Sequence, residues 1–387
     1  MATLTKNACD AIIREQDYSP DAILRFLREG ENFISVPVGI KRELSRLGYN
    51  GNDEELLEGF KKVLEKAGFN KDERKRANKW LMDGRVPSPK YGYPIRLCFA
   101  FGLSGQAALD FLWKVCRVNG FNFRRADDIV FCYCLETGRT YAEAKTLLAR
   151  YEESTAEQES GESIATKRTS LLRTVFGNLA DMDEDVFMDL LCKNKKNFFK
   201  YSVTAHEEVL ELGERLTSTL KTQIVDYNFY RKKCAILDGY EHDTTLYPEI
   251  IYAFELINQA SKGNATPFGD IMDRFPQERY LADMFRLPCE ATDKEHDKAR
   301  KAFMLLYFAD YALDPPPDEF FGDFVIALNS ALDRCGYAKL YPANPYDWLI
   351  LKCIRSLDHI NQCTGDNPVE LFNDVLVQLA EEEKHDG

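Results

Sequence analysis

Histidine and the motifs of common enzymes are scarce in this chain. Only 5 of its 387 residues are histidine, so imidazole-based catalytic dyads and zinc sites have few places to form. The sequence contains no GxGxxG, GxxxxGK(S/T) or GxSxG motif, and no helix with two histidines four residues apart around a glutamate. We therefore expect no catalytic residues and no cofactor, and predict that the protein is not an enzyme.

Long apolar runs and paired cysteines are also lacking. No stretch approaches the roughly 18 apolar residues that a membrane-spanning helix needs, and the first ten residues have no basic segment followed by an apolar one. The 11 cysteines include no CxxC pair, and Cys132 and Cys134 are too closely spaced for a zinc knuckle. These features predict a cytoplasmic protein with buried, reduced thiols, no metal and no membrane contact.

Alternating strand patterns are nearly absent, whereas apolar residues recur at the three- and four-residue spacing of helices. Residues 22–27, 56–64 and 107–115 show this spacing clearly. The one tempting strand, 33–38, contains Pro37, which argues against a strand. The fold is therefore predicted to be all-α and multi-helical.

Acidic and small residues mark the expected domain boundaries. Residues 151–163 contain no large apolar residue after Tyr151 until Ser163 and are predicted to be an acidic linker. A second break falls near residues 261–269. We predict an N-terminal helical domain over 1–150, a helical middle domain over 164–262 and a C-terminal helical domain over 263–387.

One pattern of residues appears twice in the chain. The first copy runs Trp80-Leu-Met-Asp-Gly84-Arg-Val-Pro87, Cys98-Phe-Ala-Phe-Gly-Leu-Ser104, Gly120-Phe, Asp128-Ile-Val-Phe-Cys-Tyr-Cys134. The second copy runs Leu281-Ala-Asp-Met-Phe-Arg-Leu-Pro288, Leu305-Leu-Tyr-Phe-Ala309, Gly336-Tyr, Asp347-Trp-Leu-Ile-Leu-Lys-Cys353. Because Asp128 and Asp347 each precede an apolar stretch, both are expected to begin helices and gain from the helix dipole.

The first copy follows a predicted helix-turn-helix unit. An amphipathic helix over 54–67 is followed by the turn Gly68-Phe-Asn70 and by a second helix from Lys71 to about Asp83. Residues 71–90 hold seven basic residues against three acidic ones. With a net charge of -13, the chain as a whole repels phosphates, so DNA binding requires such a local basic face. The alternative is a solvated helix face with ion pairs such as Asp72–Arg76.

The stretch from Leu56 to about Leu112 resembles the phage-repressor-like (Cro/C1-type) helix-turn-helix family. The resemblance rests on Trp80, Gly84, Pro87-Ser88 and the helix Leu97-Cys-Phe-Ala-Phe-Gly-Leu-Ser104. The segment from Gly336 to Asp347 resembles the tail of some bacterial members. In the second copy, Arg274-Phe-Pro-Gln-Glu-Arg is mixed in charge, so that copy is expected to be structural or to bind protein.

The resemblance implies a bacterial regulatory protein that binds double-stranded DNA through the first copy. Arg74, Lys75 and Lys79 are predicted phosphate contacts, and Lys71, Arg76 and Asn78 are predicted to face the major groove. Arg85 completes the predicted DNA-binding set. The alternative is an adaptor or inhibitor in a phage-defence or counter-defence setting, whose repeats no longer bind DNA and whose C-terminal copy contacts a protein partner.

Overall fold

The computed structural model describes residues 9–14, 16–28, 32–88, 92–118, 120–154, 176, 178–195, 198, 203–223, 296–313, 321–359 and positions 368, 369, 371, 372, 374, 375 and 378. Within these ranges the protein is helical and contains no β-strand, which confirms the predicted all-α fold. None of the helices in these ranges is long and apolar enough to cross a bilayer.

The first half of the described chain holds short helices. They are α2 (Pro20–Arg28), α3 (Val36–Arg46), α4 (Asp53–Lys66), α5 (Lys71–Arg74), α6 (Arg76–Leu81), α7 (Tyr93–Ala100), α8 (Gly105–Lys114), α9 (Ala126–Glu136) and α10 (Tyr141–Glu153). The rest comprises the 3-10 helix η2 (Leu179–Asp181), α12 (Glu184–Lys193), α13 (Val203–Gln223), α18 (His296–Leu313), α19 (Phe321–Cys335), α20 (Pro345–Arg355) and the 3-10 helix η5 (Ser356–His359).

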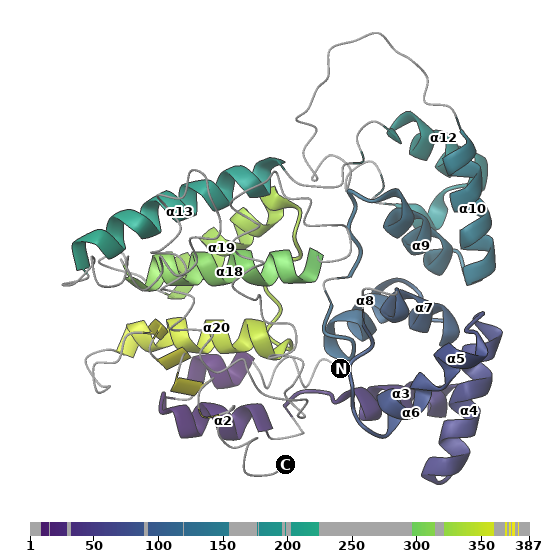
Figure 1. The fold of residues 1–387 in the computed structure, drawn as a ribbon, viewed down its shortest axis with the longest axis horizontal. Coiled ribbons are helices and arrows are strands. Elements are labelled where there is room, and N and C mark those ends of the chain that lie inside the picture. Colours follow the sequence, from purple (N-terminus) through teal and green to yellow (C-terminus); the bar gives the residue numbers. More distant parts are fainter. Residues whose placement is uncertain are drawn as a thin grey trace, which may run out of the picture.

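Buried apolar side chains form three cores. The first lies within α3 to α8, and the second joins α9, α10, η2 and α12. The third unites α13, α18, α19 and α20 with α2 and residues of 11–33. Figure 1 shows α2 beside α20, whereas α3 to α12 lie in the other half of the molecule.

The contact between the N-terminal residues and α20 is specific. The ring of Phe26 stacks on that of Trp348, with 4.4 Å between ring centroids. The Lys352 ammonium lies 4.3 Å from the Tyr18 ring centroid and donates a 3.5 Å hydrogen bond to the carbonyl of Ala11. The buried apolar residues described between Ala11 and Phe33 thus pack in the third core, whereas the sequence analysis predicted them to belong to the N-terminal domain over 1–150.

Hydrogen-bonded caps begin the helices around the predicted helix-turn-helix unit. Asn52 before α4, Asn70 before α5 and Thr140 before α10 each accept a bond from the backbone N–H three residues on. The side chain of a glutamate at that third position accepts a second bond, from the capping residue's own backbone N–H. Such capping boxes satisfy backbone donors that a helix start leaves free.

The helix expected from Lys71 to about Asp83 is interrupted. α5 ends at Arg74 and α6 begins at Arg76, while Lys75 between them keeps right-handed helical angles (φ -61, ψ -24). The segment is therefore one helical path with an irregular turn. Gly68, which precedes it, has φ +76, a left-handed conformation that most side chains avoid and that ends α4.

Several predicted features lie outside the described residues. They are the linker beyond Ser154, much of the middle domain, the break near 261–269, and the second-copy segments Arg274-Phe-Pro-Gln-Glu-Arg and Leu281–Pro288. The described part of the second copy therefore begins in α18.

Candidate nucleic-acid interface

α4, the turn over 67–70 and the helical segment 71–81 form a compact helix-turn-helix unit. Trp80 anchors the second helix, because its ring lies 6.3 Å from Phe60 of α4, 6.2 Å from Phe69 of the turn and 5.2 Å from Tyr93 of α7, measured between centroids. Trp80 is 3% exposed. Aromatic contacts at these distances add to the stabilisation from apolar burial. The outward face of the segment is thereby held in one orientation.

Arg96 of α7 fixes the turn itself. Its guanidinium bonds both carboxylate oxygens of Glu73, at 2.6 and 3.2 Å, and donates to the carbonyl of Gly68 at 3.0 Å. It also lies 3.9 Å from the centroid of the Phe69 ring. The hydrogen bond from Arg96 lowers the pKa of the Glu73 carboxyl below its ordinary range. Sequence patterns did not indicate this role, because Arg96 lies 23 positions beyond Glu73.

Six of the seven predicted DNA-binding residues are exposed. These six are Lys71, Lys75, Arg76, Asn78, Lys79 and Arg85. They surround the buried positions Ala77, Trp80 and Leu81, which face the core. The spacing of buried and exposed residues thus places the basic side chains on the outer side of the segment, as expected for an amphipathic helix.

Arg74 is the exception. Its side chain is 23% exposed and forms an ion pair with Glu65 of α4. This pair ties the end of the first helix to the start of the second. Arg74 was predicted as a phosphate contact, but the structure makes it a link between the two helices, less accessible than its neighbours.

The exposed cations differ in their partners. Lys75 forms a 2.7 Å ion pair with Asp72 three residues earlier, and the Arg76 guanidinium lies 5.5 Å from the Tyr93 ring centroid. Among the residues the structure describes, no carboxylate lies within 4.0 Å of the Lys71, Lys79 or Arg85 side chain. Their charges therefore remain available to a phosphate.

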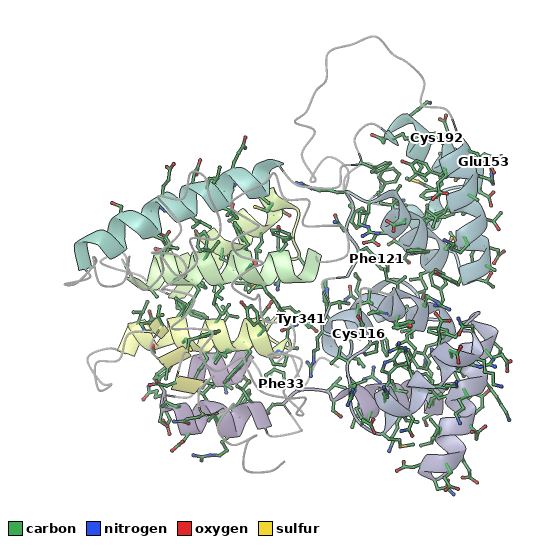
Figure 2. All side chains as sticks on the ribbon, in the orientation of Figure 1. Phe33, Cys116, Phe121, Glu153, Cys192 and Tyr341 are labelled. Carbon is green, nitrogen blue, oxygen red and sulfur yellow. The ribbon has the colours of Figure 1, made fainter. Side chains whose placement is uncertain are left out.

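Among the elements that the structure describes, those that pack on α6 lie on its inner side. α6 packs on α3 and α4, which cover its inner side. In Figure 1, α5 lies at the edge of the half formed by α3 to α12, far from α13 and α18. Figure 2 shows side chains of this region projecting outward at the same edge.

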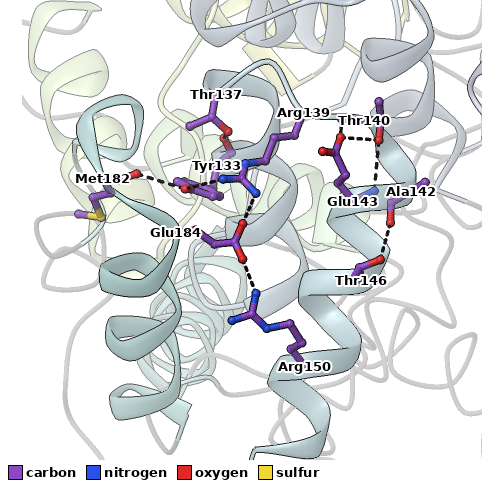
Figure 3. Close-up of polar contacts among 10 residues, drawn as sticks. All are labelled: Tyr133, Thr137, Arg139, Thr140, Ala142, Glu143, Thr146, Arg150, Met182 and Glu184. Carbon is purple, nitrogen blue, oxygen red and sulfur yellow. Dashed lines mark hydrogen bonds and ion pairs between the residues drawn. The ribbon is translucent and has the colours of Figure 1, made fainter.

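A second polar cluster lies where α9, α10 and α12 meet. Glu184 of α12 pairs with both Arg139 and Arg150, and Arg139 also donates a 3.5 Å bond to the Tyr133 hydroxyl (Figure 3). The hydrogen bond from Arg139 is the main cause of the lowered pKa of Glu184. Because the Glu184 carboxylate binds both guanidinium groups, the cluster links α12 to α10 and to the end of α9.

The closely spaced cysteines of α9 are ordinary thiols. Burial raises the pKa of both Cys132 and Cys134 to about 12. Thiols with such a pKa stay protonated and weakly reactive at neutral pH. Within the described part of the chain, no group of three or more potential metal ligands occurs.

Comparison with known proteins adds no relative. No protein-family model matches the chain, and neither the curated proteins nor the solved structures yielded a match. The resemblance to phage repressors therefore remains a prediction from the residues listed above.

Proposed function

We propose that this protein is a non-enzymatic regulator that binds double-stranded DNA through α4, α5 and α6. The observation that carries the proposal is the row of exposed cations on a helical segment whose inner side is anchored by Trp80. A rigid, outward-facing helix with basic side chains fits the major groove, where the second helix of such units docks.

We assign some of the exposed side chains to phosphates and others to base edges. Lys71, Lys79 and Arg85 have no described carboxylate partner, so neutralising a phosphate costs them no ion pair. Phosphate contacts supply most of the affinity and make it depend on salt. The remaining exposed polar side chains of the segment, Arg76 and Asn78 among them, are suited to base edges.

A protein-binding role is the alternative, and the net charge of -13 favours it. An acidic surface lowers the affinity of the whole molecule for a polyanion, and this long-range repulsion acts at low ionic strength above all. In an adaptor or inhibitor, the same helical face would contact an acidic protein surface.

The proposal is tested by fluorescence anisotropy of the full chain with a labelled duplex of random sequence, titrated at several salt concentrations. If Lys71, Lys79 and Arg85 each neutralise one phosphate, the plot of log affinity against log salt has a slope of about -2.7. Lys71→Glu combined with Lys79→Glu should weaken binding at least about tenfold and flatten the slope by about 1.8.

The matched control changes the same net charge elsewhere. Lys145 and Lys339 are exposed lysines on α10 and on the loop before α20. Lys145→Glu with Lys339→Glu should leave the affinity and the slope near those of the unmodified chain. Equal losses in the two double variants would show general charge attraction rather than a site, and no salt-dependent binding at all would favour the protein-binding role.

A further inference from the structure

Helix α5 begins with Lys71, one of the proposed DNA contacts, yet core packing does not hold this helix. None of its residues is buried, whereas α6 has Ala77, Trp80 and Leu81 in the core. A segment with few buried apolar contacts opens locally at a low cost in free energy. The position of α5, and of Lys71 with it, therefore depends on polar contacts.

Arg96 of α7 forms the more buried of the two ion pairs described between α5 and other helices. Its side chain is 11% exposed, and that of its partner Glu73 on α5 is 20% exposed. The other pair, Arg74 with Glu65 of α4, includes a carboxylate that is 64% exposed. Because water and salt screen exposed charges, we expect Arg96 to contribute more to holding α5 than the second pair does.

The same guanidinium also contacts the second core. Its central carbon lies 5.3 Å from the centroid of the Tyr141 ring, at the start of α10. The Tyr141 ring in turn stacks on Phe131 of α9, with 5.7 Å between centroids, and lies 5.5 Å from the ring of Phe99. Cation–π and aromatic contacts of this kind are attractive. Arg96 is thus shared between α5 and the unit that contains α9 and α10.

We propose that Arg96 is a positioning residue for DNA binding and that α10 controls the DNA-binding segment through it. This inference rests on the DNA binding proposed above. With Tyr141 against it, the guanidinium is kept in the orientation that binds Glu73 and the Gly68 carbonyl, so α5 stays docked. Only molecules with α5 docked present Lys71 beside the cations of α6, so the apparent affinity for DNA falls with the docked fraction. The coupling is reciprocal, and bound DNA strengthens the contact between Arg96 and Tyr141.

The first test compares two tyrosines of α10 by fluorescence anisotropy of the full chain with a labelled duplex of random sequence. Tyr141→Ala should weaken binding about threefold to fivefold, the effect of losing one cation–π contact. The salt slope should stay unchanged, because no phosphate contact is lost. Tyr151 is the matched control, since it lies at the other end of α10 with the Lys195 ammonium 4.9 Å from its ring centroid. Tyr151→Ala should leave the affinity unchanged, and Tyr141→Phe should retain it because the ring is kept.

Substitution of Arg96 itself should have a larger effect. Arg96→Gln loses the charge-assisted bonds to Glu73 and should weaken duplex binding at least about tenfold. Arg96→Lys keeps the charge but cannot bind both Glu73 oxygens and the Gly68 carbonyl with one planar group, so it should recover little of the affinity. Arg46→Gln is the control for the lost charge, because Arg46 of α3 also binds a glutamate and a backbone carbonyl. This control should leave the affinity near that of the unmodified chain.

Hydrogen exchange of the unmodified chain tests the coupling without any substitution. Saturating duplex should slow exchange at the amides of α10 as well as at those of residues 68–74. In Arg96→Gln the duplex should no longer affect α10, because the shared guanidinium is gone.

The outcomes distinguish this inference from the proposed function. A chain that binds no duplex contradicts both. The inference alone is overturned if Tyr141→Ala weakens duplex binding no more than Tyr151→Ala does, or if Arg96→Gln leaves the affinity unchanged. Exchange in α10 that does not respond to bound duplex also overturns it and leaves the proposed DNA binding standing.

Discussion

Helices α9 and α20 occupy matching places in the two copies of the pattern predicted from the sequence, yet different parts of the chain bury them. Both have 11 residues, and each carries an aspartate as its third residue, Asp128 or Asp347. Each aspartate accepts a bond from the backbone N–H six residues earlier, at 2.7 Å in the first copy and 2.8 Å in the second. The loop before the helix is thus closed in the same way.

The covering elements differ. Tyr133, five residues after Asp128, stacks on Phe187 of α12 with 3.9 Å between ring centroids. Its hydroxyl donates a hydrogen bond to the Met182 carbonyl at 3.1 Å. At the matching position of α20, Lys352 contacts Tyr18 and Ala11 near the start of the chain. α9 is therefore covered by a segment close in sequence, whereas α20 is covered by a very distant one.

The two aspartates also differ in burial and partners. Arg300 of α18 bonds both oxygens of Asp347, at 2.8 and 2.7 Å, and the side chains of this pair are 3% and 1% exposed. Asp128 lies 4.0 Å from Arg125, and the side chains of this pair are 12% and 21% exposed. The ion pair of the second copy is therefore closer and more deeply buried than that of the first.

The largest expected effect separates these two aspartates. Asp347→Ala leaves the Arg300 charge buried without its carboxylate, which should cost about 3–5 kcal/mol. Asp128→Ala loses the bond from the Asn122 N–H and a longer, more exposed contact with Arg125, and should cost about 1–3 kcal/mol. Hydrogen exchange of the backbone amides in α20 and α9 measures each loss locally. Equal losses in the two helices would contradict the difference drawn here.

A smaller effect concerns the backbone before each helix. Counting back 11 residues from the aspartate, Gly336 has φ +79 and Arg117 has φ +56. Gly336→Ala should therefore cost about 1–2 kcal/mol, because alanine adds only one methyl group at this buried position but has to adopt the left-handed conformation. Thermal unfolding of the variant tests this.

The reverse change is the control for that prediction. Arg117→Gly relieves the left-handed strain but removes the 2.8 Å bond from Arg117 to the Ile34 carbonyl. Because Arg117 is 6% exposed, the change also removes the packing of a buried side chain, so the net effect should be a destabilisation of more than about 1 kcal/mol. An unchanged or raised stability would show that the left-handed backbone conformation outweighs the side-chain contacts.

The smallest expected effect is the pH dependence of the ion pairs that attach α12 to α9 and α10. The pKa of Glu184 in the folded protein lies below its ordinary value of 4.5, because Arg139 and Arg150 favour the charged form. Its stabilisation is therefore complete above about pH 4.5 and is lost as the pH falls through the lowered pKa. Since the Glu184 side chain is 32% exposed, each pair should contribute less than about 1 kcal/mol.

The measurement is hydrogen exchange of α12 and α2 between neutral pH and the acid range. α12 should lose protection earlier in the unmodified chain than in Glu184→Gln, relative to each protein's value at neutral pH. α2 is not a pH-insensitive reference, because hydrogen bonds from Ser19 and the nearby Lys352 lower the pKa of Asp17, which precedes this helix. The deciding comparison is α12 in the two proteins, and equal pH dependence of α12 in the unmodified chain and in Glu184→Gln would argue against Glu184 as the cause.

Local sequence signals predicted the helical fold and much of the helix-turn-helix unit. Gly68 and Asn70 marked the turn, and the apolar spacing marked the buried side of α4 and of the segment after it. The exposed positions of six of the seven proposed DNA-binding residues follow from the same periodicity. The spacing of apolar residues depends only on residues close in sequence, so it predicts helices and their buried sides without knowledge of the tertiary structure.

Long-range contacts escaped prediction for the same reason. Nothing local indicated that Arg74 would turn back to Glu65, or that Arg96 would reach Glu73. Which partner a long charged side chain takes depends on elements that meet only after folding.

The stacking of Phe26 on Trp348 has a consequence for the order of folding during synthesis. More than three hundred residues separate the two rings along the chain. At about 5–20 residues per second, a ribosome needs on the order of 15–60 seconds to add them. Over that interval α3 to α8, whose core contains no residue beyond Leu135, can fold, while the nascent N-terminal segment still lacks its apolar partner.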